Sequence, residues 1–131
     1  MTTKSRTRNK TLIRKGIYSI DEVLSKTVPV KTKKKDCKVN FDGDLIKMNS
    51  QRYELFKNKG VKCVDCGIEG KYFVKEKHPS SNSYHFNLYA INKRGKEVLM
   101  TKDHIIRKRD GGADSLENYQ TMCTKCNQKK G

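Results

Sequence analysis

The chain has 131 residues, of which 34% are hydrophobic and none is Trp, so it has the length of one domain but the apolar content for only a small core. Its formal net charge of +16 exceeds what solubility requires. This charge favours a polyanionic partner, which means DNA, RNA or, least favoured, an anionic membrane surface. No stretch is long and apolar enough to span a membrane and no charged-then-apolar leader is visible, so we expect a cytoplasmic protein.

Positive charge is concentrated near the beginning of the chain. Residues 1–38 hold twelve basic and three acidic side chains, a surplus of +9 in under a third of the length. We therefore expect residues 1–38 to form a basic, partly disordered N-terminal arm and residues 39–131 to form the folded domain. Within the arm, Ser19-x-x-Glu22 has the pattern of a capping box and predicts a short helix as far as Leu24. A solvated tail and an arm that becomes ordered on nucleic acid both remain open.

The next segment has the signals of a hairpin followed by a helix. Asp42-Gly43 lies between two short alternating apolar pieces and predicts a hairpin turn. Ser50 is a suitable N-cap for a helix that carries Tyr53 and Phe56 on one face, and Gly60 ends this helix.

Strand patterns fill the middle of the chain. Residues 71–75 are short and aromatic, and residues 84–91 alternate regularly between two faces. The loop at residues 92–95 then turns the chain back, so residues 97–105 should form the return strand. This arrangement places Asp103-His104 at the end of a paired, rigid element, where a precise site is best built.

Four of the five cysteines form two Cys-x-x-Cys pairs, here called knuckles: Cys63, Cys66, Cys123 and Cys126. Paired thiolates on two tight loops are the usual ligands of a tetrahedral structural zinc, which would join distant parts of a thin core. Two disulfides are the first alternative, and the absence of a leader argues against them. A thioredoxin-like redox pair is the second, and it lacks its βαβ context. The remaining Cys37 is expected to be an exposed thiol.

One of the three histidines stands out as a candidate for catalysis. His78 lies in a polar run and His85 on a strand, and we expect both to be structural or surface residues. His104 follows the carboxylate of Asp103 and precedes a basic loop, a Gly-Gly turn, an Asp114-x-x-Glu117 cap and the second knuckle. This combination points to a built site.

The order of these parts resembles the zinc-knuckle HNH endonuclease family. The resemblance covers roughly residues 60–131 and rests on Asp-His, the Gly-Gly loop, an Asn, and Cys-x-x-Cys-Asn-x-x-Lys in one order. It implies an α+β fold with a small ββα-metal (His-Me finger) unit, a four-cysteine zinc site and a preceding antiparallel hairpin. The arrangement of residues 50–101 also looks like that of small HNH proteins common in phage genomes.

The resemblance also implies roles for individual residues. His104 matches the general base, Asp103 and Asn127 match the ligands of a catalytic divalent metal, and Asn118 matches the residue that holds the loop and orients the histidine. The four cysteines match the structural Zn²⁺ site. Because both catalytic ligands offer oxygen donors, Mg²⁺ or Mn²⁺ is expected at the catalytic position. The basic residues expected to contact nucleic acid are Arg107, Lys108, Arg109, Lys125, Lys129 and Lys130.

Two functions from different classes follow from this reading. The first is a metal-dependent DNA endonuclease that hydrolyses phosphodiester bonds with one histidine base and one divalent metal. The second is a non-cleaving, zinc-stapled module that binds nucleic acid. A pure binder has no need for a carboxylate and an amide around a histidine, which favours the enzyme. We expect DNA as the partner, no membrane, and a monomer or weak dimer.

Overall fold

The structure is a computed structural model and describes residues 11–131, so the part of the predicted arm in residues 1–10 lies outside the described residues. The strands are β1 (Ile13–Tyr18), β2 (Lys38–Phe41), β3 (Asp44–Lys47), β4 (Gly70–Lys77), β5 (His85–Ile91), β6 (Glu97–His104) and β7 (Tyr119–Cys123). The helices are α2 (Ile20–Leu24), α3 (Gln51–Lys59) and α4 (Thr124–Lys130), with single 3₁₀ turns at Lys34–Asp36, Lys108–Asp110 and Leu116–Asn118. No helix of residues 11–131 is long and apolar enough to cross a membrane.

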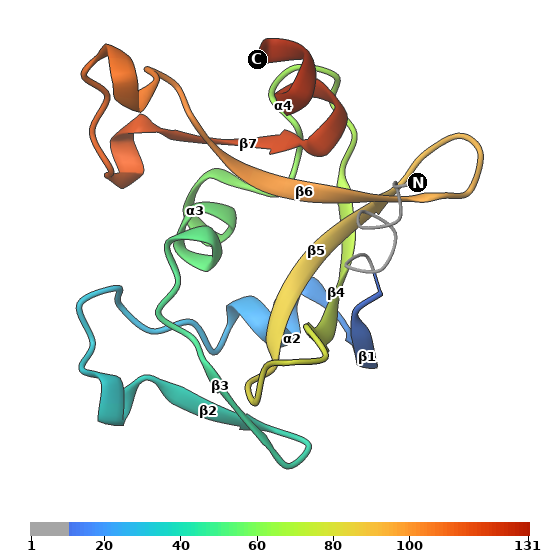
Figure 1. The fold of residues 1–131 in the computed structure, drawn as a ribbon, viewed down its shortest axis with the longest axis vertical. Helices are drawn as coiled ribbons and strands as arrows, with labels where there is room; N and C mark the ends of the chain where they lie inside the picture. The colour runs from blue at the N-terminus through green and yellow to red at the C-terminus, as the bar shows by residue number, and fades with distance from the viewer. Residues whose placement is uncertain (1–10) are drawn as a thin grey trace.

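Two antiparallel sheets organise this α+β fold. The larger sheet has the strand order β1-β4-β5-β6-β7, and the smaller consists of the hairpin β2-β3. In Figure 1 the hairpin lies at one end of the molecule and α4 at the other, with α3 between them. The predicted hairpin turn at Asp42-Gly43 and the predicted hairpin of residues 84–91 and 97–105 are therefore confirmed, with strands at residues 38–47 and 85–104.

Strand β6 takes part in two pairings along its length. Residues 97–99 pair with β5, whereas residues 100–104 pair with β7. The strand thus joins the central sheet to the C-terminal unit of β6, β7 and α4, and it places residues 103 and 104 at its far end (Figure 1).

Aromatic side chains from several elements form the centre of the core. The ring of Phe86 meets those of Phe41, Tyr18 and Phe73 edge to face, with centroids 4.8, 5.3 and 6.0 Å apart. Tyr53 of α3 is also buried, and its hydroxyl oxygen accepts a hydrogen bond from the backbone N–H of Phe86 at 2.9 Å. Such aromatic contacts compensate in part for the low hydrophobic content, because each ring buries a large apolar area.

Local signals in the sequence determine where α3 and the first hairpin begin and end. The hydroxyl of Ser50 accepts a hydrogen bond from the N–H of Arg52 at 3.0 Å, and Gly60 is the C-cap, as predicted. Asp42 and Gly43 form the two-residue turn with φ of 53° and 96°. Two consecutive positive φ values match the right-handed twist of the strands, which explains the Asp-Gly pair.

The described part of the expected arm is folded against the domain, which corrects the expectation for residues 11–38. β1 pairs with β4 at the edge of the large sheet, and Val23 and Leu24 of α2 are buried. The side chain of Ser19 accepts a hydrogen bond from the backbone N–H of Glu22, so the predicted N-cap is present. Cys37 is only 1% exposed, so the expectation of an exposed thiol is wrong. Apolar residues spaced among the lysines bury enough surface to keep this segment packed on the domain. The expectation is wrong because it is based on net charge alone.

Candidate active site and metal centre

The C-terminal unit has two antiparallel strands followed by a helix. His104 of β6 is paired directly with Tyr119 of β7, and Met100 with Cys123. α4 begins immediately after β7 and packs against β6. As a result, the end of β6 and the end of α4 lie next to each other, and polar residues from both elements come together there.

A pocket of about 300 Å³ lies at this point of convergence. It brings together three of the predicted site residues, Asp103, His104 and Asn127, although Asn127 is 23 positions further along the chain than His104. Its remaining walls are mainly basic, and the lining is completed by Lys102, Arg107, Lys108, Lys130 and Gly131. A concave surface with one carboxylate, one imidazole and four cationic side chains suits an anionic substrate.

Asp103 is the acidic group of the pocket and is 8% exposed. Its Oδ2 accepts hydrogen bonds from Gln120 Nε2 at 2.9 Å and Lys130 Nζ at 2.6 Å. Lys130 also donates to the backbone carbonyl of His104 at 2.6 Å. The buried carboxylate therefore has a cation and an amide as partners, which offset the cost of its removal from water.

His104 is held between an aromatic ring and a carboxylate. Its ring meets the ring of Tyr119 edge to face with centroids 5.1 Å apart, and its Nε2 lies 2.7 Å from Asp114 Oδ1. Asp114 also pairs with Lys108 at 2.9 Å. The hydrogen bonds from His104 and Lys108 lower the pKa of the Asp114 carboxyl, and Asp114 in turn raises the pKa of Lys108.

Asp114 was predicted to cap the following turn, and this prediction is wrong. The N-cap of that turn is Ser115, which makes no side-chain capping hydrogen bond. Sequence reasoning missed the contact with His104 because it depends on how the loop folds back. The Gly-Gly signal indicated a turn but not its direction.

Asn118 lies outside the pocket wall and bridges the loop that precedes it. Its Oδ1 accepts from the N–H of Ile106 at 2.9 Å, and its Nδ2 donates to the carbonyls of Ile106 at 3.0 Å and Ala113 at 2.9 Å. The backbone carbonyl of Asn118 also accepts from the N–H of Ile105 at 2.7 Å. These bonds connect the start and the end of the loop that follows His104.

Gly112 allows this loop to close. A Cβ at this position would lie 1.8 Å from the carbonyl oxygen of Ile106 and 2.8 Å from Nδ2 of Asn118. We expect Gly112→Ala to displace the loop and lower nuclease activity by about tenfold or more, since misplacement by about 1 Å can cost about 10²-fold. Steady-state cleavage rates and a thermal melt would measure both effects.

Gly111→Asn is the matched control for that substitution. Gly111 has φ of 92° and open space around its Cβ position. Asn tolerates positive φ better than most residues, so this variant should keep most of the activity. Equal activity of the two variants would show that the close contact at Gly112 does not matter.

The predicted nucleic-acid contacts separate into two groups. Arg107, Lys108 and Lys130 line the pocket, where Arg107 pairs with Asp110 at 2.8 Å. Arg109, Lys125 and Lys129 do not line it. Sequence reasoning missed Lys102, which lies in the pocket and whose ammonium is 4.1 Å from the centroid of the Tyr119 ring. A lysine within an ordinary strand gave no signal beyond its place before Asp103.

The four knuckle cysteines form a cluster that can hold a metal ion. Their Sγ atoms all lie within 4.8 Å of one another, and those of Cys66 and Cys123 are 3.8 Å apart. Sulfurs bound at about 2.3 Å to one tetrahedral zinc lie about 3.8 Å apart, so the donor set fits this metal. The backbone N–H of Val64 donates to the carbonyl of Thr121 at 3.0 Å, which aligns the first knuckle with β7.

Electrostatics within the cluster also favour a cation. Burial opposes ionisation of Cys63, but backbone N–H donors of Cys123, Cys66 and Asp65 outweigh it and lower its pKa to about 6. Burial raises the pKa of Cys123 and Cys126, and the sulfur of Cys63 adds to the rise at Cys123. The Cys63 thiolate thus forms readily whereas Cys123 and Cys126 resist ionisation, and a bound divalent cation would relieve this resistance.

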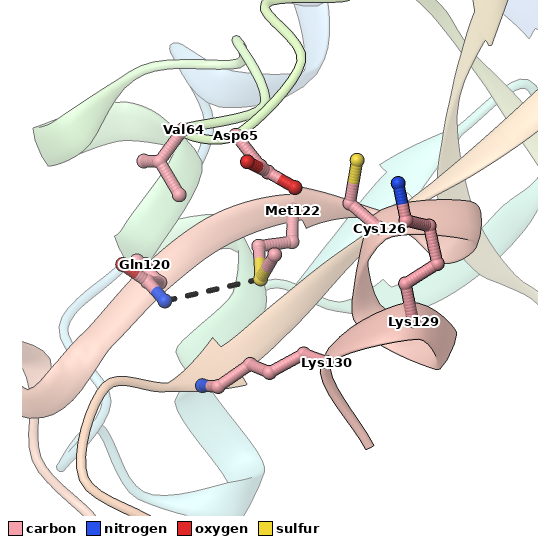
Figure 2. A pocket seen from close by; sticks show the side chains of 7 residues that line it. All are labelled: Val64, Asp65, Gln120, Met122, Cys126, Lys129 and Lys130. Carbon is pink, nitrogen blue, oxygen red and sulfur yellow. Dashed lines mark hydrogen bonds between the residues drawn. The ribbon is translucent and has the colours of Figure 1, made fainter.

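A second concavity, of about 430 Å³, lies next to the cysteine cluster. Figure 2 shows Val64 and Asp65 of the first knuckle facing Lys129 and Lys130 of α4, with Gln120 and Met122 of β7 between them. Neither His104 nor Asn127, which line the smaller pocket, lines this one. Lys130 lines both concavities.

Comparison with known proteins agrees with this geometry. The model of the HNH endonuclease family matches residues 91–131, which run from the end of β5 through α4. No curated protein and no solved structure matches the chain. The matched segment holds Asp103, His104 and the second knuckle, whereas the first knuckle precedes it. Residues 91–131 are therefore similar to the HNH endonuclease family, and this similarity indicates nuclease activity in general.

Proposed function

We propose that this protein is a metal-dependent DNA endonuclease that hydrolyses phosphodiester bonds. The observation that carries the proposal is the convergence of Asp103, His104 and Asn127 on one basic pocket within the HNH domain. Phosphodiester hydrolysis needs a base for water and compensation of phosphate charge, and this pocket offers both.

His104 is the proposed general base. It lines the pocket and packs against Tyr119, and because its Nε2 is bonded to Asp114, Nδ1 is the proposed acceptor of the proton from water. Lys102, Arg107 and Lys108 line the same pocket and are proposed to neutralise the charge of the phosphate and to fix its position. Asn118 is proposed to keep the loop, and through it the imidazole, in place.

Asp103 and Asn127 are the proposed ligands of the catalytic metal. Asp103 Oδ1 and Asn127 Oδ1 have no hydrogen-bond partner among residues 11–131, whereas Asn127 Nδ2 donates to Thr101 Oγ1 at 3.0 Å. Oxygen donors of this kind suit Mg²⁺ or Mn²⁺. When bound, such an ion would supply Lewis-acid stabilisation of the phosphate and the leaving oxygen.

The four cysteines are proposed to hold a structural Zn²⁺ ion. The proposal is supported by the sulfur separations and by the low pKa of Cys63. Zinc suits four thiolates, whereas Mg²⁺ and Mn²⁺ prefer oxygen ligands, so the two metals would keep to separate sites.

A cleavage assay decides between the enzyme and a module that only binds nucleic acid. Purified protein should convert supercoiled plasmid to nicked or linear DNA when Mg²⁺ is added, and should leave it intact without a divalent ion. Binding without cleavage across Mg²⁺ and Mn²⁺ titrations would favour the zinc-stapled binding module.

Asp103→Ala should weaken metal binding and not the chemistry itself. Losing one of two oxygen ligands raises the Mg²⁺ concentration needed for half-maximal cleavage, by about tenfold or more, and excess Mn²⁺ should restore part of the activity. The measurement is cleavage rate against metal concentration with zinc retained in the protein. Asp110→Ala, which removes an exposed carboxylate paired with Arg107, is the control and should leave this metal requirement unchanged. An unaltered requirement in Asp103→Ala would remove this residue from the metal site.

A further inference from the structure

The hairpin β2-β3 carries a pair of lysines in an unfavourable arrangement. Lys38 and Lys47 are directly opposite each other in the register of the two strands, and both are exposed. Neither forms a salt bridge or side-chain hydrogen bond with any residue of the described range 11–131. Like charges directly opposite in an antiparallel pair repel each other and destabilise the hairpin.

The two carboxylates of the hairpin itself, Asp42 and Asp44, are already engaged. Asp44 pairs with Lys15 at 3.1 Å and with the buried Lys75 at 2.8 Å. Asp42 accepts a hydrogen bond from the hydroxyl of Tyr18. The hairpin therefore keeps two positive charges together on its outer face while its acidic residues serve the contact with the large sheet.

These lysines border a concavity of about 280 Å³ between the hairpin and the loop that connects β4 to β5. Its lining is Lys38, Leu45, Lys47, Ser81, Ser83, Tyr84 and His85. No carboxylate lines it, unlike the pocket at Asp103. Burial and the nearby Arg52 lower the pKa of His85, so its ring adds a neutral hydrogen-bonding group to the hydroxyls. Leu45, 60% exposed, adds an apolar surface at the edge.

This combination suits a phosphodiester better than any other partner class. Two adjacent ammonium groups and hydroxyl groups bind phosphate oxygens, and an apolar edge can contact the sugar. An acidic peptide offers similar charge, but the DNA substrate proposed above already supplies a regular series of phosphates. Binding would also relieve the repulsion between the two lysines.

We propose that Lys38 and Lys47, with the concavity beside them, form a second phosphate-binding site for the DNA backbone, separate from the active pocket. The inference rests on the proposed function for the identity of the polyanion. In Figure 1 the hairpin and α4 lie at opposite ends of the longest axis, so a duplex that contacts both must extend along the molecule. A globular chain of this length is roughly 35 Å across, which corresponds to about ten base pairs.

The test compares two double variants with the same loss of charge. Lys38→Thr/Lys47→Thr changes the proposed site and keeps residues that favour strands. Lys93→Thr/Lys96→Thr changes two exposed lysines in the turn between β5 and β6 and is the control. Affinity for a DNA duplex of about 20 base pairs is measured by fluorescence anisotropy from about 50 to 200 mM salt, with His104→Ala in every protein to prevent cleavage.

The hairpin variant should lose about tenfold in affinity near physiological salt, and its log-log salt slope should fall by about 2, since each phosphate contact contributes about 0.9. The control should lose less than about threefold, because it changes only the net charge. The melting temperature of the hairpin variant should stay equal or rise, since the repulsion is removed. If Lys38 and Lys47 instead served only to stabilise the hairpin, the double substitution would lower the melting temperature.

Equal losses in the two variants would overturn the inference, as would a salt slope unchanged in the hairpin variant. Cleavage at saturating DNA, measured in the hairpin variant with His104 present, should match wild type. If wild type bound DNA in this hairpin-dependent manner but never cleaved it, the proposed endonuclease function would fail while the second site would stand.

Discussion

His104→Ala is expected to reduce plasmid cleavage by about 10²-fold or more while leaving DNA affinity close to wild type. The imidazole lines the active pocket and is the group proposed to accept the proton of the attacking water. The substitution removes neither proposed metal ligand nor any knuckle cysteine, so the metal response and the melting temperature should change little. Unlike Asp103→Ala, this variant should not recover at high Mn²⁺ or Mg²⁺.

His78→Ala is the matched control for the base. His78 is exposed, and its Nδ1 lies 2.8 Å from the hydroxyl of Ser80 in the loop between β4 and β5, outside the C-terminal unit. The His78→Ala variant should cleave plasmid at the wild-type rate. A His104→Ala protein that cut plasmid as fast as His78→Ala would refute the proposal that the pocket of Asp103 and His104 is the active centre.

Cys63→Ser should abolish tight zinc binding and most of the cooperative fold. In zinc-dependent peptides the metal contributes on the order of 10 kcal/mol to folding, and a hydroxyl is a poor replacement for a thiolate. Backbone N–H donors also lower the pKa of the Cys63 thiol to about 6, so the substitution removes a thiolate that forms readily. Elemental analysis of the purified protein and a thermal melt would show the loss, and Cys126→Ser should behave alike.

Cys37→Ser controls for the change of a buried thiol. Cys37 is buried like Cys63 but lies outside the four-sulfur cluster, where its Sγ is 3.4 Å from the carbonyl oxygen of Lys34. The Cys37→Ser variant should retain one zinc per chain, and its melting temperature should fall only modestly. Wild-type protein purified without zinc and with two disulfides under non-reducing conditions would contradict the zinc model.

The sequence predicted much of the scaffold because the signals involved are local. Asp-Gly requires a turn with positive φ, Ser50 and Gly60 delimit a helix, and alternation in residues 84–91 defines a strand. The two Cys-x-x-Cys spacings carry enough information to anticipate the sulfur cluster, because each knuckle supplies two neighbouring ligands.

Other features depend on contacts between segments that are far apart in the sequence, and local sequence patterns do not predict such contacts. The contact between Asp114 and His104 follows from the path of the glycine loop, and the Lys130 ion pair with Asp103 follows from the packing of α4 on β6. The same reason explains the error over the arm. A count of charges in residues 1–38 does not reveal that Val23 and Cys37 become buried against other elements.

The double pairing of β6 limits how small an active fragment can be. The segment that matches the HNH endonuclease model starts at residue 91, but residues 97–99 of β6 are paired with β5, and two of the four cysteines lie before residue 67. A peptide excised at residue 91 would lose its neighbouring strand and half of the sulfur ligands together. The residues upstream of the matched segment therefore supply a neighbouring strand and two of the four candidate metal ligands, so a folded fragment should have to include them.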